Sequence, residues 1–262
     1  MKKFTVLALF AALLLTGKSL VAQEGENDLK NFRFGIYGQP AISWYKPDNP
    51  DIMESKGSKL TFAYGLLLEF RLNKVACIST GLAANYSGGR LGFKTDTIIY
   101  SSNNDADTFR LLSRDYKVSY AEVPFTIKMK TPEIGAFTYF GQFGVNIKFK
   151  TKAKSITDDG FFIQNKAYVS GSKNNVDISN DMAFLNLGLN IGGGLEYNLA
   201  GSTSLIFSVN YNNGFMNVLR TKSKSLQKLT TTVTSGIPTY TYEEYEQIAK
   251  PNYVSFSVGF LF

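Results

Sequence analysis

Residues 60–71 read LTFAYGLLLEFR, and the alternation of side chains in this stretch decides the fold. One face of an extended strand is here apolar and holds Leu60, Phe62, Tyr64, Leu66, Leu68 and Phe70. The other face is small or polar and ends in Glu69 and Arg71. Such a strand fits a membrane barrel whose apolar face meets lipid, and it also fits a soluble β-sandwich whose apolar face meets a core. The soluble alternative therefore stays open at this point.

Eight segments share this period of two, and each has about ten or more residues, the length with which a tilted strand crosses a membrane. They lie near residues 31–43, 59–71, 75–88, 116–130, 136–149, 183–199, 203–214 and 252–262. Three of the connections are tight (72–74, 131–135 and 200–202), whereas the others are long. Short turns on one side and long loops on the other are typical of outer-membrane barrels. The sequence thus predicts an all-β, eight-stranded antiparallel up-and-down transmembrane β-barrel over residues 31–262, with both of its ends periplasmic.

The first 22 residues are predicted to be a secretory signal peptide. Lys2 and Lys3 precede an apolar run over residues 4–15, which is too short to span a bilayer. Residues 23–30 then form a short periplasmic segment, and an uncleaved N-terminal anchor is the alternative. For an exported barrel we expect outer-membrane lipid and the barrel assembly machinery as partners. The mild formal charge of +7 gives no reason to expect nucleic acid.

Charged residues are predicted inside the barrel where the alternation turns them away from lipid. They are Arg33, Glu69, Arg71, Glu122, Lys128, Lys148 and Glu196. The interior of an eight-stranded barrel is just wide enough for side chains to fill it, and buried charges need partners. We therefore expect a salt-bridged plug. A narrow conduction path or small-ligand path is the alternative.

Two further features concern the strand ends and the fourth strand. The apolar face of residues 116–130 changes parity between Tyr120 and Val123, which predicts a bulge near Glu122 and Pro124.

Aromatic residues near strand ends predict girdles at the lipid headgroups, with ordinary β propensity as the alternative. These aromatic residues are Trp44, Tyr45, Tyr86, Tyr116, Tyr211 and Phe215.

A family resemblance rests on residues 120–128, which read YAEVPFTIK. This stretch resembles the Tyr-Leu-Glu-Ile-Pro-like segment of the PorT-like outer-membrane β-barrel family of Bacteroidota. A Gly-rich early strand at 34–38, a strand at 65–72 and an aromatic C-terminus follow the family order across residues 31–262. The resemblance implies an outer-membrane barrel, and some relatives take part in type IX secretion and gliding.

The last residues of the chain resemble the C-terminal assembly signal of outer-membrane barrels. That signal closes with an aromatic residue, any residue and a second aromatic residue, here Phe260, Leu261 and Phe262, with Gly259 just before them. We expect Gly259, Phe260 and Phe262 to contribute to barrel insertion.

Several kinds of chemistry are not expected from this sequence. Histidine is absent, so the histidine general base of barrel hydrolases and proteases has no counterpart, and we expect no enzyme. With Cys77 as the only cysteine, we expect no transition-metal site and no cofactor. Acidic groups at 105/107, 158/159 and 243/244/246 are interpreted as solvated loop carboxylates, with calcium binding as the alternative.

Residues 220–246 are predicted to lie outside the cell. Two basic clusters would face the phosphates of lipopolysaccharide on the cell surface, and a solvated loop is the alternative for each. One consists of Arg220, Lys222, Lys224 and Lys228, and the other, in the loop that follows the predicted strand 136–149, consists of Lys150, Lys152 and Lys154. Residues 230–234 and 239–245 favour strands and predict a hairpin that extends the last strands and offers a surface to a protein partner.

The leading hypothesis from the sequence is a non-enzymatic outer-membrane barrel with a structural or interaction role, such as an accessory in an outer-membrane assembly of the type IX secretion kind. A narrow channel or small-ligand transporter is the second hypothesis. A soluble secreted β-barrel or sandwich that binds a ligand is the third.

Overall fold

The computed structural model describes residues 31–94, 98–100, 108–164, 167–234 and 237–262. The predicted signal peptide (1–22), the predicted segment 23–30 and the acidic pair 105/107 lie outside the described residues. The barrel belongs to one compact unit that spans Asn31–Phe262.

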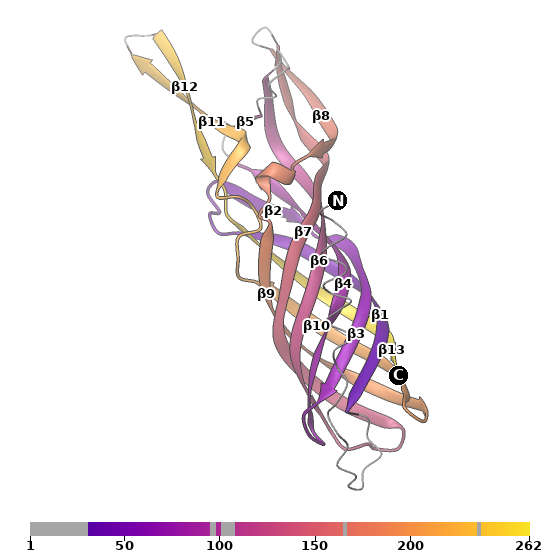
Figure 1. Ribbon diagram of the computed structural model, residues 1–262. Coiled ribbons are helices and arrows are strands. Elements are labelled where there is room, and N and C mark those ends of the chain that lie inside the picture. Colours follow the sequence, from indigo (N-terminus) through magenta and orange to yellow (C-terminus); the bar gives the residue numbers. More distant parts are fainter. Residues whose placement is uncertain (1–30, 95–97, 101–107, 165–166, 235–236) are drawn as a thin grey trace, which may run out of the picture. The chain divides into compact units, whose positions relative to one another are not determined.

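Eight antiparallel strands form a closed ring within the described residues (Figure 1). They are β1 (Phe32–Pro47), β3 (Lys59–Arg71), β4 (Ala76–Phe93), β6 (Thr108–Lys130), β7 (Phe137–Gln164), β9 (Leu185–Ala200), β10 (Thr203–Gly214) and β13 (Ala249–Leu261). Each ring strand pairs with the next one along the chain, and β13 closes the ring against β1 in a register from Gly35↔Leu261 to Pro47↔Ala249. The predicted eight-stranded up-and-down barrel is confirmed.

The connections are short at one end of the barrel and long at the other. Residues 72–75, 131–136 and 201–202 join β3 to β4, β6 to β7 and β9 to β10. The first residue of β1 and the last residue of β13 lie at this short-turn end (Figure 1). In outer-membrane barrels the short turns are periplasmic, so this end faces the periplasm.

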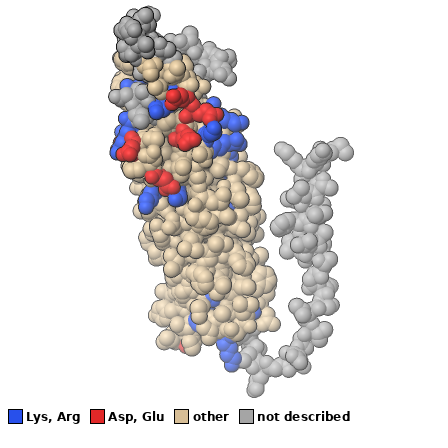
Figure 2. Space-filling view, turned by 90° about the vertical axis from the view of Figure 1, so that its left-hand side faces the viewer, with Lys and Arg blue, Asp and Glu red and all other residues tan. Residues whose placement is uncertain are grey.

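An apolar belt surrounds the middle of the barrel. In β3 the side chains of Leu60, Phe62, Tyr64 and Leu66 are exposed, while Ala63 and Glu69 on the opposite face are buried. Figure 2 shows the same arrangement on one face, where charged side chains gather toward the ends and leave the middle almost free of charge. A continuous exposed apolar band is rare on soluble proteins and is the surface that lipid covers in membrane barrels. No helix among the described residues is long and apolar enough to cross a membrane.

The long-loop end is built from ordered strands. β4, β6 and β7 continue far beyond the belt (Figure 1). They pair there with the shorter strands β2 (Met53–Gly57), β5 (Ile98–Tyr100) and β8 (Ala167–Asp177), respectively. The same end also holds the 3₁₀ helix η1 (Ser179–Asp181) and the strands β11 (Lys222–Thr234) and β12 (Ile237–Glu246). We call this part, beyond the membrane belt, the extracellular sheet.

The predicted hairpin at 230–245 is present as β11 and β12, but its attachment differs from the expectation. β11 pairs with β5, which pairs with β6, so the hairpin extends the sheet beside β6 and not the strands β10 and β13. Leu226, which lies opposite Tyr100, is fully buried. The burial of this apolar residue against the extracellular sheet accounts for the attachment.

An apolar core fills the extracellular end of the barrel. It contains Tyr45, Met53, Leu91, Phe93, Phe109, Leu111, Tyr116, Val118, Tyr120, Ala153, Ile178, Met182, Val218, Leu219, Leu226, Tyr245 and Ala249. Tyr45 and Tyr116 were predicted in the girdle, but they pack edge to face within this core at 5.4 Å between ring centroids. Tyr86, Tyr211 and Phe215 do face outward and are exposed.

The same core explains why the predicted bulge at Glu122 and Pro124 was wrong. Tyr116, Val118, Tyr120 and Glu122 are all buried, so the inward parity of β6 is continuous through this region. The β4–β6 register is also unchanged from Thr80↔Phe125 to Ala83↔Glu122. The β6–β7 register does shift between Ser119 and Tyr120, but the extra residue there is Thr151 on β7. The interior itself changes from polar within the membrane to apolar above it, which reverses the apolar face of β6 without an extra residue in β6.

Candidate functional site: an interior closed at both ends

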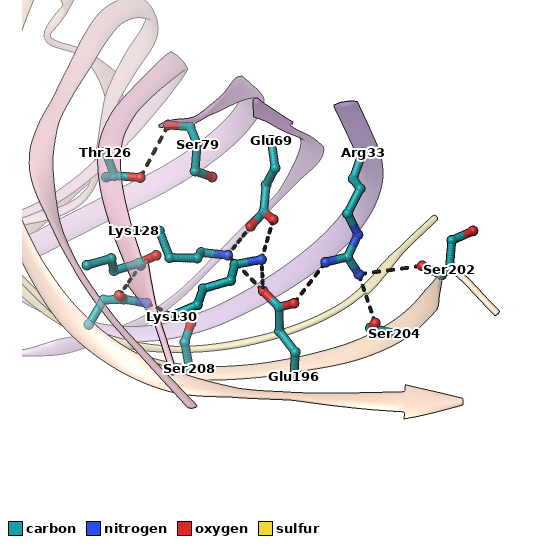
Figure 3. A network of polar contacts seen from close by, with 12 residues as sticks. Arg33, Glu69, Ser79, Thr126, Lys128, Lys130, Glu196, Ser202, Ser204 and Ser208 are labelled. Carbon is teal, nitrogen blue, oxygen red and sulfur yellow. Dashed lines mark hydrogen bonds and ion pairs between the residues drawn. The ribbon is translucent and has the colours of Figure 1, made fainter. Parts of the chain in front are cut away.

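Five charged side chains close the periplasmic end of the barrel (Figure 3). Arg33 on β1 donates to Glu196 on β9 at 2.9 Å and to the hydroxyl of Ser204 at 2.8 Å. Lys128 on β6 donates to Glu69 on β3, and Lys130 donates to Glu69 at 2.8 Å. We call Arg33, Glu69, Lys128, Lys130 and Glu196 the periplasmic plug.

The ion pairs of the periplasmic plug join strands that are not neighbours in the ring. β4 lies between β3 and β6, and β7 lies between β6 and β9. Although Arg33 lies opposite Glu69 in the β1–β3 register, its guanidinium reaches past β13 and β10 to Glu196. These bonds therefore cross the lumen, and the plug forms only when the barrel is closed.

Burial and multiple ion pairs make the plug a tight obstruction, in which three cations share two carboxylates. Glu69, Lys128 and Glu196 are at most 4% exposed. The ring of Phe140 lies beneath Lys128, with 4.3 Å between Nζ and the ring centroid. Buried charges persist at such a site because each has several partners of opposite sign or hydrogen-bond partners.

The structure places Arg71 at the same end but outside this network. Its side chain is half-buried, and Nη1 has no hydrogen-bond partner among the described residues. Lys130 was missed by the sequence reasoning, although its even number gives it the same inward parity as Lys128. Lys130 is the last residue of β6, and the inward–outward alternation of side chains is least regular at strand ends, so the alternation did not assign this lysine to the barrel interior.

Amides and hydroxyls fill the middle of the barrel. Gln142 donates to Asn210 at 2.5 Å, and Asn146 donates to Asn212 at 2.7 Å. Beside them lies a cavity of about 80 Å³, which is room for a few water molecules. The predicted interior residues Glu122 and Lys148 lie above this layer, 3.8 Å apart, and Lys148 also lies over the ring of Tyr253 at 4.1 Å.

A second buried ion-pair cluster lies in the extracellular sheet. Arg114 on β6 donates to both carboxylate oxygens of Asp158 on β7, each at 2.8 Å, and the three side chains of Arg114, Asp158 and Asp181 are about 1–2% exposed. Asp181 of η1 also accepts from the hydroxyl of Ser223 at 2.9 Å and from the backbone N–H of Lys224 at 2.8 Å. This outer cluster thus fastens the start of β11 over the mouth of the barrel.

The interpretation of residues 158/159 as solvated loop carboxylates was wrong for Asp158. Residues 158 and 159 lie within strand β7, where Asp158 is buried and Asp159 pairs with Arg90 at the surface. Glu243, Glu244 and Glu246 lie on β12, where Glu244 is 2.5 Å from Lys222. Among the described residues, no group of three or more acidic or cysteine side chains is arranged to hold a metal ion.

The remaining predicted site residues lie on the surface or at the β1–β13 seam. Arg220, Lys222, Lys224 and Lys228 are exposed, and all but Arg220 lie on β11. Gly259 lies opposite Tyr37, and a Cβ at this position would lie 2.5 Å from the carbonyl oxygen of Ile36. Phe260 faces outward, and the ring of Phe262 lies 5.4 Å from that of Phe34.

Comparison with known proteins gives one family match. The family model described as outer membrane protein beta-barrel domain matches residues 21–220. No curated protein matches the chain.

Solved structures with a similar arrangement of strands are remote in sequence. Neisserial surface protein A shares 10% identity with a TM-score of 0.41, over 90% of this chain and 98% of that chain. OprG from Pseudomonas aeruginosa shares 14% identity with a TM-score of 0.40, over 88% and 95%. Ail of Yersinia pestis shares 15% identity with a TM-score of 0.32, over 89% and 100%.

The family match spans more than half of the chain, and it agrees with the closed ring of strands and with their exposed apolar belt. The protein is therefore integral to the outer membrane, and the chain belongs to the outer membrane protein beta-barrel domain family.

Proposed function

We propose that this protein is a closed, non-enzymatic outer-membrane barrel that binds a protein partner through its extracellular sheet. One observation carries the proposal: the interior is obstructed at both ends, by the periplasmic plug and by the apolar extracellular core. The cavity between them holds about 80 Å³. That volume is smaller than the roughly 300–1,000 Å³ of sites that enclose a small ligand, so a transport path is disfavoured.

The interior also lacks the groups that barrel enzymes use. The chain has no histidine to serve as a general base. The interior carboxylates of Glu69 and Glu196 are engaged by lysine or arginine side chains, and Glu122 accepts from Asn85 at 2.5 Å. These side chains serve as ion-pair and hydrogen-bond partners, which favours a structural role for them.

The extracellular sheet supplies the binding surface. β8 and β12 are its outermost strands within the described part of the chain, and each presents an unpaired edge. Tyr168 and Val169 on β8 are exposed, as is Tyr242 on β12. An unpaired strand edge beside exposed apolar side chains is suited to an extended segment of another protein, which adds a strand to the sheet.

The resemblance to PorT-like barrels supports a finer proposal about the partner. We infer that the partner is a component of an outer-membrane assembly, of which type IX secretion is one example. The closed interior agrees with an accessory role, because an accessory barrel needs no conduction path of its own.

Co-purification from native membranes tests the function. In one variant, residues 230–241 are replaced by Asn-Gly, which joins Leu229 to Tyr242, a directly opposed pair in the hairpin. This change removes the distal edge and keeps Leu226 and Tyr245 in the core. The companion variant, with Tyr168→Ser and Val169→Ser, alters the β8 edge instead.

We expect wild-type protein to retain a stoichiometric partner that one of the two variants loses, while heat-modifiable migration on gels stays unchanged in both. Recovery of the same proteins with all three forms, or recovery of the barrel alone, would contradict the proposal.

A further inference from the structure

We propose that the outer wall of the barrel binds a phosphorylated glycolipid of the outer leaflet, with its phosphate on Lys117, Lys152 and Lys154 and its acyl chain in a groove below them. This site lies on the lipid-facing side of β3, β4, β6 and β7. It is separate from the closed interior and from the edges of the extracellular sheet, and it goes beyond the function proposed above.

The floor of the groove is a row of small side chains. In register across the sheet, Tyr64 on β3 lies opposite Ala84 on β4, Ala84 lies opposite Ala121 on β6, and Ala121 lies opposite Phe149 on β7. Two adjacent alanines thus separate two large aromatic rings on the surface that faces lipid. This difference in height produces a depression between the two rings.

The depression is large and almost wholly apolar. It has a volume of about 720 Å³, and its walls include Ile36, Leu66, Leu82 and Tyr86. A second groove of about 520 Å³ adjoins it at Tyr86 and is bordered by Lys117. Volumes of this size match small-molecule sites, and an apolar lining suits an acyl chain.

Three lysines lie directly above the groove. Lys152 lies opposite Ser119, which lines the groove, and one row farther out Lys117 lies opposite Lys154. Lys117 and Lys152 are exposed, and no ion pair of either is found within the described residues. Asp177 is opposite Lys154 on β8. Asp115, two residues before Lys117 on β6, is paired with Lys59 at 2.7 Å, so the three ammonium groups still exceed the carboxylates left to them.

This arrangement costs stability unless an anion is present. Like charges directly opposite each other in a sheet are destabilising. Lys117 and Lys154 form such a pair, and Lys152 lies two residues from Lys154 on the same strand. A phosphate placed among the three would offset their repulsion and accept a hydrogen bond from each.

The depth of the lysines identifies the phosphate as that of a lipid. Tyr86, an outward aromatic residue at the end of the belt, lies opposite Ser119, and Lys117 comes two residues farther toward the extracellular side. Aromatic residues of this kind mark the headgroup level. The apolar groove extends from there into the hydrocarbon region, where a segment of a soluble protein does not reach. A membrane lipid is arranged in the same order, with its headgroup at the membrane surface and its acyl chain below.

Lipid binding by purified protein in detergent micelles tests the site, with bis-phosphorylated lipid A as the probe and native mass spectrometry as the readout. The test variant carries Lys117→Glu, Lys152→Glu and Lys154→Glu. The control variant carries Arg220→Glu, Lys224→Glu and Lys228→Glu, which changes the net charge equally at the other of the two basic clusters that the sequence indicates.

We expect the test variant to bind the probe at least tenfold more weakly and the control variant to bind as the wild type does. Removal of the phosphates from the probe should weaken binding to the wild type and leave binding to the test variant unchanged. Equal loss in both variants would mean attraction by net charge alone, and loss confined to the control would assign the site to residues 220–228. Either result, or full binding by the test variant, overturns the proposal.

A second variant separates the groove from the lysines. Ala84→Phe together with Ala121→Phe fills the floor with side chains suited to lipid and leaves all three lysines in place. We expect this variant to keep heat-modifiable migration and to bind lipid A more weakly, while inorganic phosphate competes with the probe as it does for wild type. Unchanged lipid A binding would show that the groove holds no chain and would contradict the proposal.

Discussion

Lys130 at the end of β6 lies 2.7 Å from Glu196 on β9, with β7 between the two strands. One carboxylate thus receives Lys130 from one side of the lumen and Arg33 from the other, where Nη1 is 2.9 Å away. The periplasmic mouth is held shut by bonds across the barrel and not by pairs along its wall.

Glu196→Gln should destabilise the barrel, because it leaves Lys130 and Arg33 short of negative charge at a buried site. Removal of one partner from a buried ion pair costs about 3–5 kcal/mol. Urea unfolding of the protein in micelles, followed by tyrosine and tryptophan fluorescence, measures the change in the free energy of unfolding. Glu133→Gln is the matched control, since Glu133 is exposed at the same end of the barrel. An equal effect of both substitutions would contradict the role of the plug.

Arg114→Met should loosen the extracellular sheet while the membrane part stays folded. The substitution leaves Asp158 and Asp181 buried without their guanidinium partner, again at a cost of about 3–5 kcal/mol. Limited proteolysis should then cut within residues 179–184 and 215–226, outside the ring strands β9 and β10, much faster than in the wild type. Arg90→Met removes an exposed pair with Asp159, worth about 0–1 kcal/mol, and should leave the cleavage rate nearly unchanged. Resistance to proteolysis in the Arg114 variant would show that the outer cluster does not fasten the sheet.

Gly259→Val should impair insertion into the outer membrane. A Cβ at this position would lie 2.8 Å from the Cβ of Tyr37 and closer still to the backbone of Ile36, so the β1–β13 seam could not close at its present separation. The fraction of protein with heat-modifiable migration in outer-membrane preparations measures insertion. Val258→Ile, one residue earlier and facing outward, should insert as the wild type does. Equal insertion of both variants would exclude a requirement for glycine at the seam.

Asp177 gives a pH-dependent prediction for the extracellular sheet. The backbone N–H of Ser179 donates to its carboxylate at 2.8 Å and, together with the Ser179 hydroxyl, holds the pKa of Asp177 below its usual value. Because the pKa is lowered by folding, its contribution to stability is present above the unfolded pKa of about 3.9 and is lost as the pH falls through the folded pKa. A carbon-13 carboxyl titration should find a higher midpoint in Ser179→Ala than in the wild type. The same midpoint in both would rule out the hydroxyl as a cause of the shift.

The membrane part of the barrel was predictable because lipid on one side and a polar interior on the other impose a regular period of two. Glu69, Lys128 and Glu196 could be assigned to the interior by parity alone. Their ion-pair partners could not be assigned by parity, since Arg33 does not pair with its register neighbour Glu69 but with Glu196.

The extracellular part was not predictable by the same rule. Above the membrane the inside of the sheet is apolar, so Tyr116 and Val118 point inward where the rule for lipid-facing strands would point them outward. Asp158 suggested a loop because carboxylates are seldom buried, and only its partner Arg114, 44 residues away in sequence, explains its place in a strand. Such partners are fixed by strand register, which composition does not reveal.

Planar bilayer recording of the purified wild-type protein tests the closed interior most directly. The periplasmic plug and the extracellular core both obstruct the lumen, so we expect no sustained conductance above that of the bare bilayer. Sustained, ion-selective conductance that changes with substitution of Lys128 or Glu196 would contradict a closed barrel and would favour the narrow channel.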